Sequence, residues 1–331
     1  ETNPDAYKTL SYHEGALPDK DFSKRFSYDA GIVPFVGRKQ EQKELKEFLN
    51  NGKDRFRWWA ITGPGGAGKS RLAFEFQKQV VAEWKVRYLT TEDYDELSKL
   101  SDHLTQKTLL IADYIQEYAQ KLGRWMETLK ECDRSLPLRV LLVERESKNK
   151  ISETTGERQL IDTSWEKQLY NQVRHEKDLR KACYKEDFLN LQPLSDQDLQ
   201  NVIKNYADAL QSQNNILSDK DTQMLLKKLK DIDPDLCRPL YAMFLTDAFL
   251  AGKEPEKWSQ EDVLDYVLER EQKRLDFCIA HVTHAEDGDE ELFDACQFIL
   301  CLATVLQDIK IDTLQKICPQ QWEIIKNKKR N

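Results

Sequence analysis

A glycine-rich segment constrains the fold of this chain more than any other feature. It comprises Gly63, Pro64, Gly65, Gly66, Ala67, Gly68, Lys69 and Ser70. The segment fits GxxxxGK[ST], in which glycines allow backbone N–H groups to close around phosphate oxygens. In this pattern Lys69 adds positive charge toward the β and γ phosphates, and the Ser70 hydroxyl is a ligand for Mg²⁺. The segment therefore predicts a P-loop that binds a nucleoside triphosphate with magnesium.

The flanking sequence supplies the context that a P-loop requires. Phe56–Thr62 forms an apolar run that predicts a buried strand, and Leu72, Phe76 and Val80 repeat every four residues. This spacing predicts a helix directly after the loop. The N-terminus of that helix adds a partial positive charge for phosphate. An ordinary glycine-rich turn is the alternative, and the agreement of motif and context disfavours it.

Asp113 is the candidate acid for the metal. It follows the apolar run Thr108–Ala112, which predicts a strand that delivers one carboxylate to the edge of a sheet. This is the Walker B pattern, in which Asp113 would hold Mg²⁺ directly or through water. The alternative is an aspartate that simply ends a strand in a turn.

Further strands alternate with helical stretches. A helix is predicted after Gly37 because Leu45, Phe48 and Leu49 have helical spacing. Additional strands are predicted at 85–89, 139–143 and 187–191. Alternation of this kind indicates parallel βαβ units, so we expect an α/β fold with a parallel sheet between helical layers.

The predicted strands stop after Pro193. Ser195 and Ser259 each precede an aspartate by three residues, which is the spacing of a helix capping box. Leu240, Met243 and Phe244 predict an amphipathic helix between them. We therefore expect four parts: a linker or tail of an upstream domain at 1–30, a P-loop domain at 31–193, an all-helical lid at 194–255, and a helical or partial winged-helix region at 256–331.

Composition excludes several classes of protein. The chain has 50 Lys+Arg against 58 Asp+Glu, a net charge of -8, so direct nucleic-acid binding is not supported. No apolar run approaches the roughly 18 residues of a membrane span. The seven cysteines include no CxxC pair, which fits a reducing, cytoplasmic location. The chain begins at Glu1 and not at a methionine, so we interpret the sequence as a piece of a longer protein.

His281 and His284 lie near several acidic residues. A metal cluster is one interpretation of this segment, and we favour a solvated acidic loop.

Other P-loop classes lack their signatures here. Asp113 is followed by Tyr114, Ile115 and Gln116, so the DxxG of small GTPases is missing, and no NKxD occurs. GTP specificity is therefore disfavoured. The LSGGQ of transporter ATPases is also missing from the sequence.

The segment before the P-loop resembles a known family. Val33-Pro34-Phe35-Val36-Gly37-Arg38, followed by Glu41, is similar to the hhGR motif of STAND NTPases, which include the NB-ARC and NACHT groups and are related to AAA+ ATPases. The resemblance implies that this motif passes over the adenine. Backbone at Phe35 and Val36 would bind the base, with Gly37 and Arg38 in the same site. Core packing of Phe35 and Val36 is the alternative.

Two later segments follow the family order. Leu138–Arg145 resembles the fourth strand with its terminal sensor arginine, which implies that Arg145 reaches the γ-phosphate or Asp113. An ion pair with a neighbouring glutamate, Glu144 or Glu146, is the alternative for that arginine. Trp58–Ala73 also resembles the WWxxTGPGGAGKSRLA loop of bacterial STAND-like proteins, and Arg71 within it is placed among the nucleotide-binding residues.

The segment Arg238-Pro239-Leu240 resembles the GxP motif of the family's helical lid. The resemblance implies that Pro239 packs against adenine. Cys237 replaces the family's glycine, which is a departure from the motif. A proline in the first turn of a helix also occurs for purely local reasons.

The resemblance implies a switch driven by ATP and ADP. AAA+ ATPases have a glutamate directly after the Walker B aspartate, whereas this chain has Tyr114, and only Glu117 could act as a displaced base. We therefore expect slow ATP hydrolysis with Lys69, Asp113 and Arg145 as catalytic residues. Expected partners are other protein domains or subunits, with self-association on activation. The alternatives are an AAA+ remodelling ATPase and a P-loop scaffold without a nucleotide cycle.

Overall fold

The computed structural model describes eleven stretches of the chain. They are residues 25–52, 54–101, 106–132, 135–145, 150–152, 159–161, 164–210, 217–269, 291–292, 294–299 and 316–328. The described residues fall into two compact units. One unit runs from Tyr28 to Lys257, and the other includes 25–27 and the described residues from Trp258 onward.

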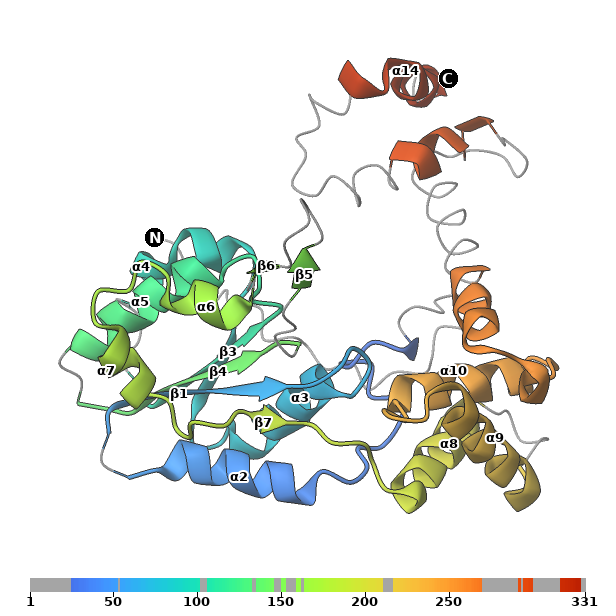
Figure 1. Ribbon diagram of the computed structural model, residues 1–331, viewed down its shortest axis with the longest axis horizontal. Helices are drawn as coiled ribbons and strands as arrows, with labels where there is room; N and C mark the ends of the chain where they lie inside the picture. Colours follow the sequence, from blue (N-terminus) through green and yellow to red (C-terminus); the bar gives the residue numbers. More distant parts are fainter. Residues whose placement is uncertain are drawn as a thin grey trace. The chain divides into compact units, whose positions relative to one another are not determined.

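A five-stranded parallel sheet forms the centre of the first unit (Figure 1). Its strands are β1 (Phe56–Thr62), β2 (Lys85–Tyr88), β3 (Thr108–Asp113), β4 (Leu138–Val143) and β7 (Leu189–Asn190). The spatial order is β2-β3-β4-β1-β7. Val143 pairs with both Ile61 of β1 and Asp113 of β3, so three strands end at one edge beside the glycine-rich loop. The predicted α/β fold is confirmed.

Helices cover both faces of the sheet (Figure 1). The buried residues alternate along each strand, as in β1, where Trp58 faces one core and Trp59 faces the other. Helices α5 (Ala119–Glu131) and α6 (Trp165–Tyr170) pack on the first core. Helices α2 (Lys39–Asn50) and α3 (Lys69–Val80) pack on the second. Both helices predicted from periodicity are present, and the residues that predicted them are buried: Leu45, Phe48, Leu49, Leu72, Phe76 and Val80.

Several short elements were not predicted. These are η1 (Glu92–Asp95), α4 (Leu97–Ser101), α6, α7 (Glu176–Lys181) and the antiparallel pair β5 (Lys150–Ser152) and β6 (Gln159–Ile161). Each is shorter than the window in which periodicity is informative. Helices α5 and α6 approach so closely that a Cβ atom on Gly123 would lie 1.7 Å from the carbonyl oxygen of Leu169.

A helical region follows the sheet within the same unit. It contains α8 (Asp196–Leu210), α9 (Asp219–Ile232), α10 (Pro239–Leu250) and the short η2 (Pro255–Lys257). The Ser195 hydroxyl caps α8 by accepting from the backbone N–H of Asp198 at 3.1 Å, as its spacing predicts. Helix α10 differs from the amphipathic helix that we predicted, because seven of its residues on several sides are buried. It is therefore an inner helix of this region.

The second unit contains a described helix that begins at Gln260 and α14 (Pro319–Lys328). The predicted capping box at Ser259 is present: its N–H donates to the Asp262 carboxylate at 2.5 Å, and the Asp262 N–H donates to the Ser259 hydroxyl at 3.3 Å. Residues 1–24, the acidic segment at 281–290 and much of the predicted winged-helix region lie outside the described residues. No helix in the described part of the chain is long and apolar enough to cross a membrane.

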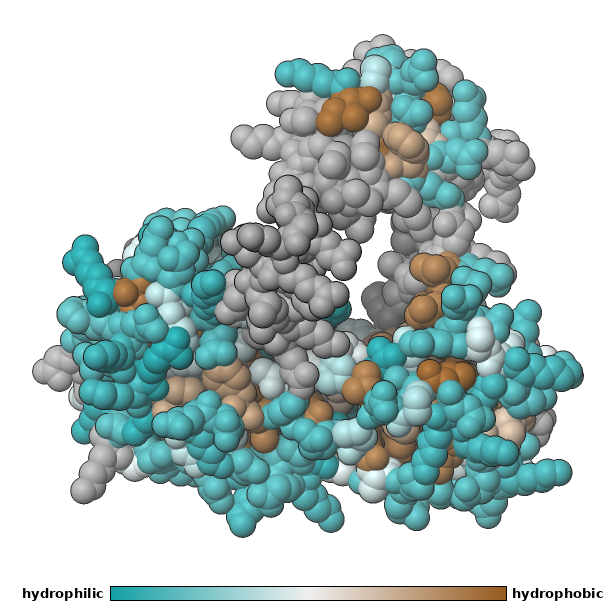
Figure 2. Space-filling view, in the orientation of Figure 1, coloured by the Kyte–Doolittle hydropathy of each residue, from teal (hydrophilic) through white to brown (hydrophobic). Residues whose placement is uncertain are grey.

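The surface of the described residues is mostly hydrophilic in the view of Figure 2. In the first unit the large apolar side chains that are strongly exposed are Val81, Tyr114 and Leu136. Tyr114 is the most exposed of them, at 68%. This residue lies directly after Asp113, at the edge of the sheet that carries the candidate site.

Candidate nucleotide-binding site

The glycine-rich loop has the backbone that its sequence predicts. Gly63, Gly66 and Gly68 have φ angles of 146°, 81° and 93°, in the region that side chains disfavour. Lys69 begins α3, so the N-terminus of this helix adjoins the loop. The Lys69 ammonium donates to the carbonyl oxygens of Gly63 at 2.8 Å and Pro64 at 2.9 Å. The lysine therefore lies over the loop, where a bound phosphate would meet it.

Ser70 and Asp113, the two candidate metal ligands, are in contact. The Ser70 side chain hydrogen-bonds the Asp113 carboxylate. Burial raises the pKa of Asp113 above its ordinary value, although Ser70, the Tyr114 N–H and Lys69 act in the opposite direction. A half-buried carboxylate that is short of positive charge and paired with a hydroxyl fits a hard divalent cation such as Mg²⁺.

Two tyrosines lie near the same carboxylate. The hydroxyls of Tyr88 and Tyr94 are buried and have no hydrogen-bond partner among the described residues. Burial raises the pKa of both phenols, and the charge of Asp113 adds to the effect. Neither tyrosine was singled out from the sequence, because the pattern around them marks only the end of a strand and a turn.

Tyr114 directly follows Asp113 and has a left-handed backbone conformation. Its φ angle is 55°, and its N–H lies 3.0 Å from Oδ1 of Asp113 and 3.1 Å from the carbonyl oxygen of Val143. The left-handed backbone accompanies a ring that is 68% exposed. Glu117, the displaced base that we considered, is also exposed, in the turn before α5.

Glu144 is a site residue that sequence reasoning missed. It follows β4 and is only 5% exposed. Its Oε2 accepts from the N–H of Gln116 at 3.0 Å, and its Oε1 accepts from the N–H of Arg145 at 2.7 Å. The carboxylate thereby joins the turn after β3 to the residue after β4. An apolar strand that ends in an acid beside an arginine is the signal that could have identified it.

Arg145, which the sequence predicts to be a sensor arginine, lies beside Gly65 of the loop. A Cβ atom on Gly65 would lie 3.6 Å from Nη2 of Arg145. The backbone of Arg145 is held in place by Trp165, whose indole N–H donates to its carbonyl oxygen at 3.0 Å. The side chain is exposed, so its charge faces the loop from the solvent side.

Arg38 of the hhGR-like segment is occupied by protein groups. Its Nη1 donates to the carbonyl oxygen of Gln192 at 2.6 Å and to the Glu41 carboxylate at 2.8 Å. Its Nη2 donates to the carbonyl oxygen of Ala67 at 3.2 Å. One guanidinium therefore connects the phosphate loop with the segment that leads from the sheet into α8.

The neighbours of Arg38 are partly buried. Phe35 packs against the core that contains α2 and α3, and Val36 is half-buried. Gly37 has a φ angle of 68°, and a Cβ atom there would lie 3.0 Å from the Asp198 carboxylate of α8. The side chains of this segment thus serve packing, and its backbone is the part that remains a candidate for adenine.

Arg71 holds the chain before the hhGR-like segment. It donates to the carbonyl oxygens of Tyr28 at 2.8 Å and Val33 at 2.9 Å. The Tyr28 ring packs edge-on against Phe74, and burial together with the charge of Asp113 raises the pKa of its phenol. The sequence alone predicts a linker at 1–30 that includes Tyr28, because nothing local distinguishes this residue from that polar stretch.

The start of α10 touches the phosphate loop. The N–H of Leu240 lies 3.5 Å from the carbonyl oxygen of Gly66, and a Cβ atom on Gly66 would lie 3.2 Å from Cβ of Leu240. Pro239 is the first residue of the helix, and Cys237 has a φ angle of 41°. Cys237 thus adopts the conformation for which glycine, the family's residue, is suited. Helix α10 and the loop are therefore adjacent.

Arg238 fixes this helix start. It donates from Nε and Nη2 to the two oxygens of the Asp233 carboxylate at 2.9 Å and 3.1 Å. Its guanidinium also lies 3.9 Å from the ring centroid of Tyr241. The bidentate pair holds the chain that enters α10 against the end of α9.

Comparisons with known proteins complete these observations. No family model and no curated protein matches the chain. Among solved structures it is similar to the Aeropyrum pernix ORC2 protein, solved as ADPNP-ADP complexes, with a TM-score of 0.49 and 16% identity over 89% of this chain and 82% of that one.

Two further solved structures are similar to the chain at lower TM-scores. For a variant of Thermotoga maritima RuvB the TM-score is 0.44, with 14% identity over 86% of this chain and 84% of that one. For C. elegans PCH-2 it is 0.39, with 12% identity over 74% and 70%. The P-loop NTPase fold follows from the sheet and the loop: a parallel sheet, a glycine loop between β1 and α3, and Asp113 at the end of β3.

Proposed function

We propose that this chain is a signal-transduction NTPase module of STAND type that binds ATP and ADP with Mg²⁺. The observation that carries the proposal is the contact of α10 with the phosphate loop at Gly66. A nucleotide held by the loop would touch the sheet-based part and the helical region together. Whether ATP or ADP is bound would therefore control how the sheet-based part and the helical region are held together. Such control is the basis of a conformational switch.

The chain's own residues have distinct tasks in this proposal. Lys69 and the loop N–H groups bind phosphate, and Ser70 and Asp113 hold the cation, which would neutralise phosphate charge when bound. Arg145 approaches the phosphates from the end of β4. Pro239 closes the adenine side, and backbone at 35–36 supplies hydrogen bonds to the base.

Arg38 is the residue that we propose couples the two parts. It holds a loop carbonyl at Ala67 and a carbonyl at Gln192, just before the helical region. A shift of the loop on nucleotide exchange would therefore displace the chain that leads into α8. Arg38→Lys keeps the charge but removes the planar fork, so it tests this link without deleting the cation.

Calorimetry with ATP, ADP and GTP tests binding. We expect Mg²⁺-dependent binding of both adenine nucleotides, and Lys69→Ala should weaken it at least about tenfold, which is 1.4 kcal/mol. Lys78→Ala is the matched control, because Lys78 lies on the same helix and pairs with Glu75. Preference for GTP, or unchanged ATP affinity in Lys69→Ala, would contradict the proposal.

Hydrogen exchange with and without ADP tests the switch. At a hundredfold excess over its dissociation constant a ligand stabilises the state it binds by about 2.7 kcal/mol. We expect protection both at 63–70 and at 237–245 in the unmodified chain. In Arg38→Lys the protection at 63–70 should persist, whereas protection at 237–245 should fall. Protection confined to the loop in the unmodified chain would show that 194–255 is not a nucleotide-gated lid.

Hydrolysis separates this proposal from a remodelling ATPase of AAA+ type. We expect turnover well under the roughly 10 s⁻¹ median of enzymes, because Tyr114 is exposed and cannot act as a base. A single-turnover assay measures the chemical step directly. Fast phosphate release that is lost in Glu117→Gln would favour the remodelling ATPase and assign the base to Glu117.

A further inference from the structure

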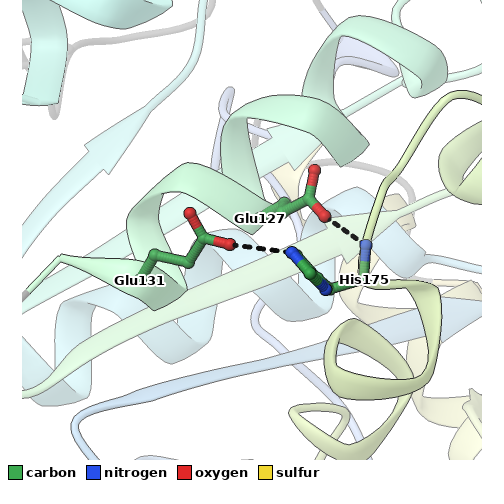
Figure 3. A group of neighbouring side chains, drawn as sticks. All are labelled: Glu127, Glu131 and His175. Atoms are coloured by element: carbon green, nitrogen blue, oxygen red, sulfur yellow. Dashed lines mark hydrogen bonds and ion pairs between the residues drawn. The ribbon is translucent and has the colours of Figure 1, made fainter.

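A second cluster of potential ligands lies on α5 and α7. Figure 3 shows Glu127 and Glu131 of α5 and His175 at the start of α7, with their polar groups turned toward one another. One ligand atom from each of the three side chains can be chosen such that all lie within 4.8 Å of one another. The two glutamates are four residues apart on one helix and therefore share a face.

The three residues also border a cleft. Its walls are Glu127, Lys130, Glu131, His175, Asp178 and Leu179. Leu179 is 1% exposed, so one side of the cleft is formed by a core residue, and the other lining residues are polar. Asp178 adds a further carboxylate to the rim. An ordinary surface ion pair needs no cleft, whereas this cleft provides room for a ligand.

The existing contacts hold the cluster close to coordination geometry. The backbone N–H of His175 donates to Oε1 of Glu127 at 2.5 Å, which fixes that carboxylate. Nε2 of His175 lies 3.8 Å from Oε1 of Glu131, beyond hydrogen-bond distance. Ligands at about 2.0–2.2 Å from a tetrahedral metal are about 3.3–3.6 Å apart. Rotamer adjustment of the two exposed side chains closes that difference.

We propose that Glu127, Glu131 and His175 bind a divalent transition metal, with Zn²⁺ as the fitting ion. One imidazole nitrogen and two carboxylate oxygens are a donor set for zinc, whereas magnesium prefers oxygen ligands alone. Three protein ligands leave a further position for water or for Asp178. The metal would join the C-terminal part of α5 to His175, the residue just before α7, so it acts as a clamp between two helices.

This site is separate from the nucleotide site. Helix α5 connects the parallel strands β3 and β4, so it runs back from the edge that carries Asp113. Glu131 is its last residue, about 18 Å along the helix from Ala119 at 1.5 Å per residue. The two sites therefore share no ligand, and each can be lost without the other.

Zinc calorimetry on the nucleotide-free full chain tests the proposal. We expect one zinc ion to bind at the cluster and His175→Gln to abolish this binding. Glu131→Gln should lower the zinc affinity by at least roughly 10–100-fold, which is the cost of losing an outer-shell partner. His281→Gln/His284→Gln is the matched histidine control and should retain the ion. Lys69→Ala should also retain it, which separates this test from the nucleotide proposal.

Cobalt identifies the donor atoms. Substitution of Co²⁺ should give d–d absorption without thiolate charge-transfer bands, since the proposed ligands include no cysteine. Zinc should also raise the melting temperature of the unmodified chain and of Glu117→Gln, but not that of His175→Gln. Unchanged zinc binding in His175→Gln, thiolate bands with cobalt, or no binding by the unmodified chain would overturn the proposal and leave an ion pair only.

Discussion

The layers around the sheet and the helical region at α8–α10 bury charged groups in different ways. Around the sheet, two buried charges near strand ends bind backbone groups: Glu144 accepts from backbone N–H groups, and Arg139 donates to the carbonyl oxygens of Phe48 and Asn51. In the helical region, buried aspartates join side chains of different segments. Asp247 of α10 accepts from the Tyr206 hydroxyl of α8 at 2.9 Å.

This difference shows what specifies each part. The sheet layers are specified by near-continuous apolar strands whose side chains point alternately to two cores, and polar groups lie mainly at the strand ends. The helical region depends on particular polar pairs, because an inner helix such as α10 offers little amphipathic pattern to fix its orientation. Substitutions around the sheet should therefore change stability mainly through side-chain volume. Substitutions in the helical region at α8–α10 should change it mainly through lost hydrogen-bond partners.

The largest effect is expected where two helices of the sheet layers meet. Gly123→Ala would place a Cβ atom 1.7 Å from a backbone oxygen, so α5 and α6 must move apart. We expect a loss of about 3 kcal/mol in the free energy of unfolding, the upper range for overpacking, measured by urea denaturation. Gly52→Ala is the control, because a Cβ atom there meets nothing within 4 Å. Equal stability of the two variants would contradict this packing.

A pair of tyrosines contrasts the two regions directly. Tyr206→Phe removes a buried partner of Asp247 and should destabilise the chain by about 1–3 kcal/mol. Tyr94→Phe should not destabilise the chain and should stabilise it by up to about 1 kcal/mol, because the buried Tyr94 hydroxyl has no partner among the described residues and its burial is uncompensated. Thermal denaturation of both variants compares them. A larger loss in Tyr94→Phe would reverse the contrast.

At Cys237, in the turn before α10, glycine should be more favourable than alanine, which is the opposite of their order inside a helix. Cys237 has a φ angle of 41°, which glycine adopts without a steric penalty and alanine does not. We expect Cys237→Gly to be more stable than Cys237→Ala by about 1 kcal/mol, in paired chemical denaturation experiments. The comparison cancels the loss of the buried thiol, which both variants share. If alanine were the more stable, the left-handed turn would not be present in solution.

The smallest effect concerns Asp113 and has a definite sign. Burial raises the pKa of Asp113, so its contribution to stability is present at acidic pH and is lost as pH rises through the raised value. Asp113→Asn should therefore stabilise the nucleotide-free chain at neutral pH, with a gain that shrinks toward acidic pH, while Mg²⁺–ATP binding weakens. Melting curves at several pH values check the sign. A gain that grows on acidification would contradict it.

The P-loop and its sheet could be predicted because their signals are local. The glycine pattern, the apolar run before it and the period of Leu72, Phe76 and Val80 lie within a few turns of one another. The role of Arg38 could not be predicted, because its partners at Ala67 and Gln192 are 29 and 154 residues away. Tyr28 was assigned to a linker for the same reason.

The residues of the candidate site also differ in whether a local sequence pattern reveals them. Lys69, Ser70 and Asp113 were found from motifs that require particular atoms at fixed spacing, and the structure places them together. Glu144 was missed because its importance lies in two backbone N–H groups from which it accepts, which no sequence pattern encodes. Cys237 departs from the glycine of the GxP motif, yet its φ angle of 41° is one that glycine adopts readily.

The spatial order of the strands has a consequence for synthesis on the ribosome. β1 carries the phosphate loop at its end, yet its neighbours are β4 and β7. The earlier of these is β4, in which Leu138 pairs with Phe56 and follows it by 82 residues (138 − 56). At about 5–20 residues per second, that partner follows after about 4–16 s. Until then the strand Phe-Arg-Trp-Trp-Ala-Ile-Thr has two unpaired edges and an apolar surface, which favours association with other nascent chains. The strand that precedes the phosphate loop is thus a segment of the nascent chain that a chaperone would protect.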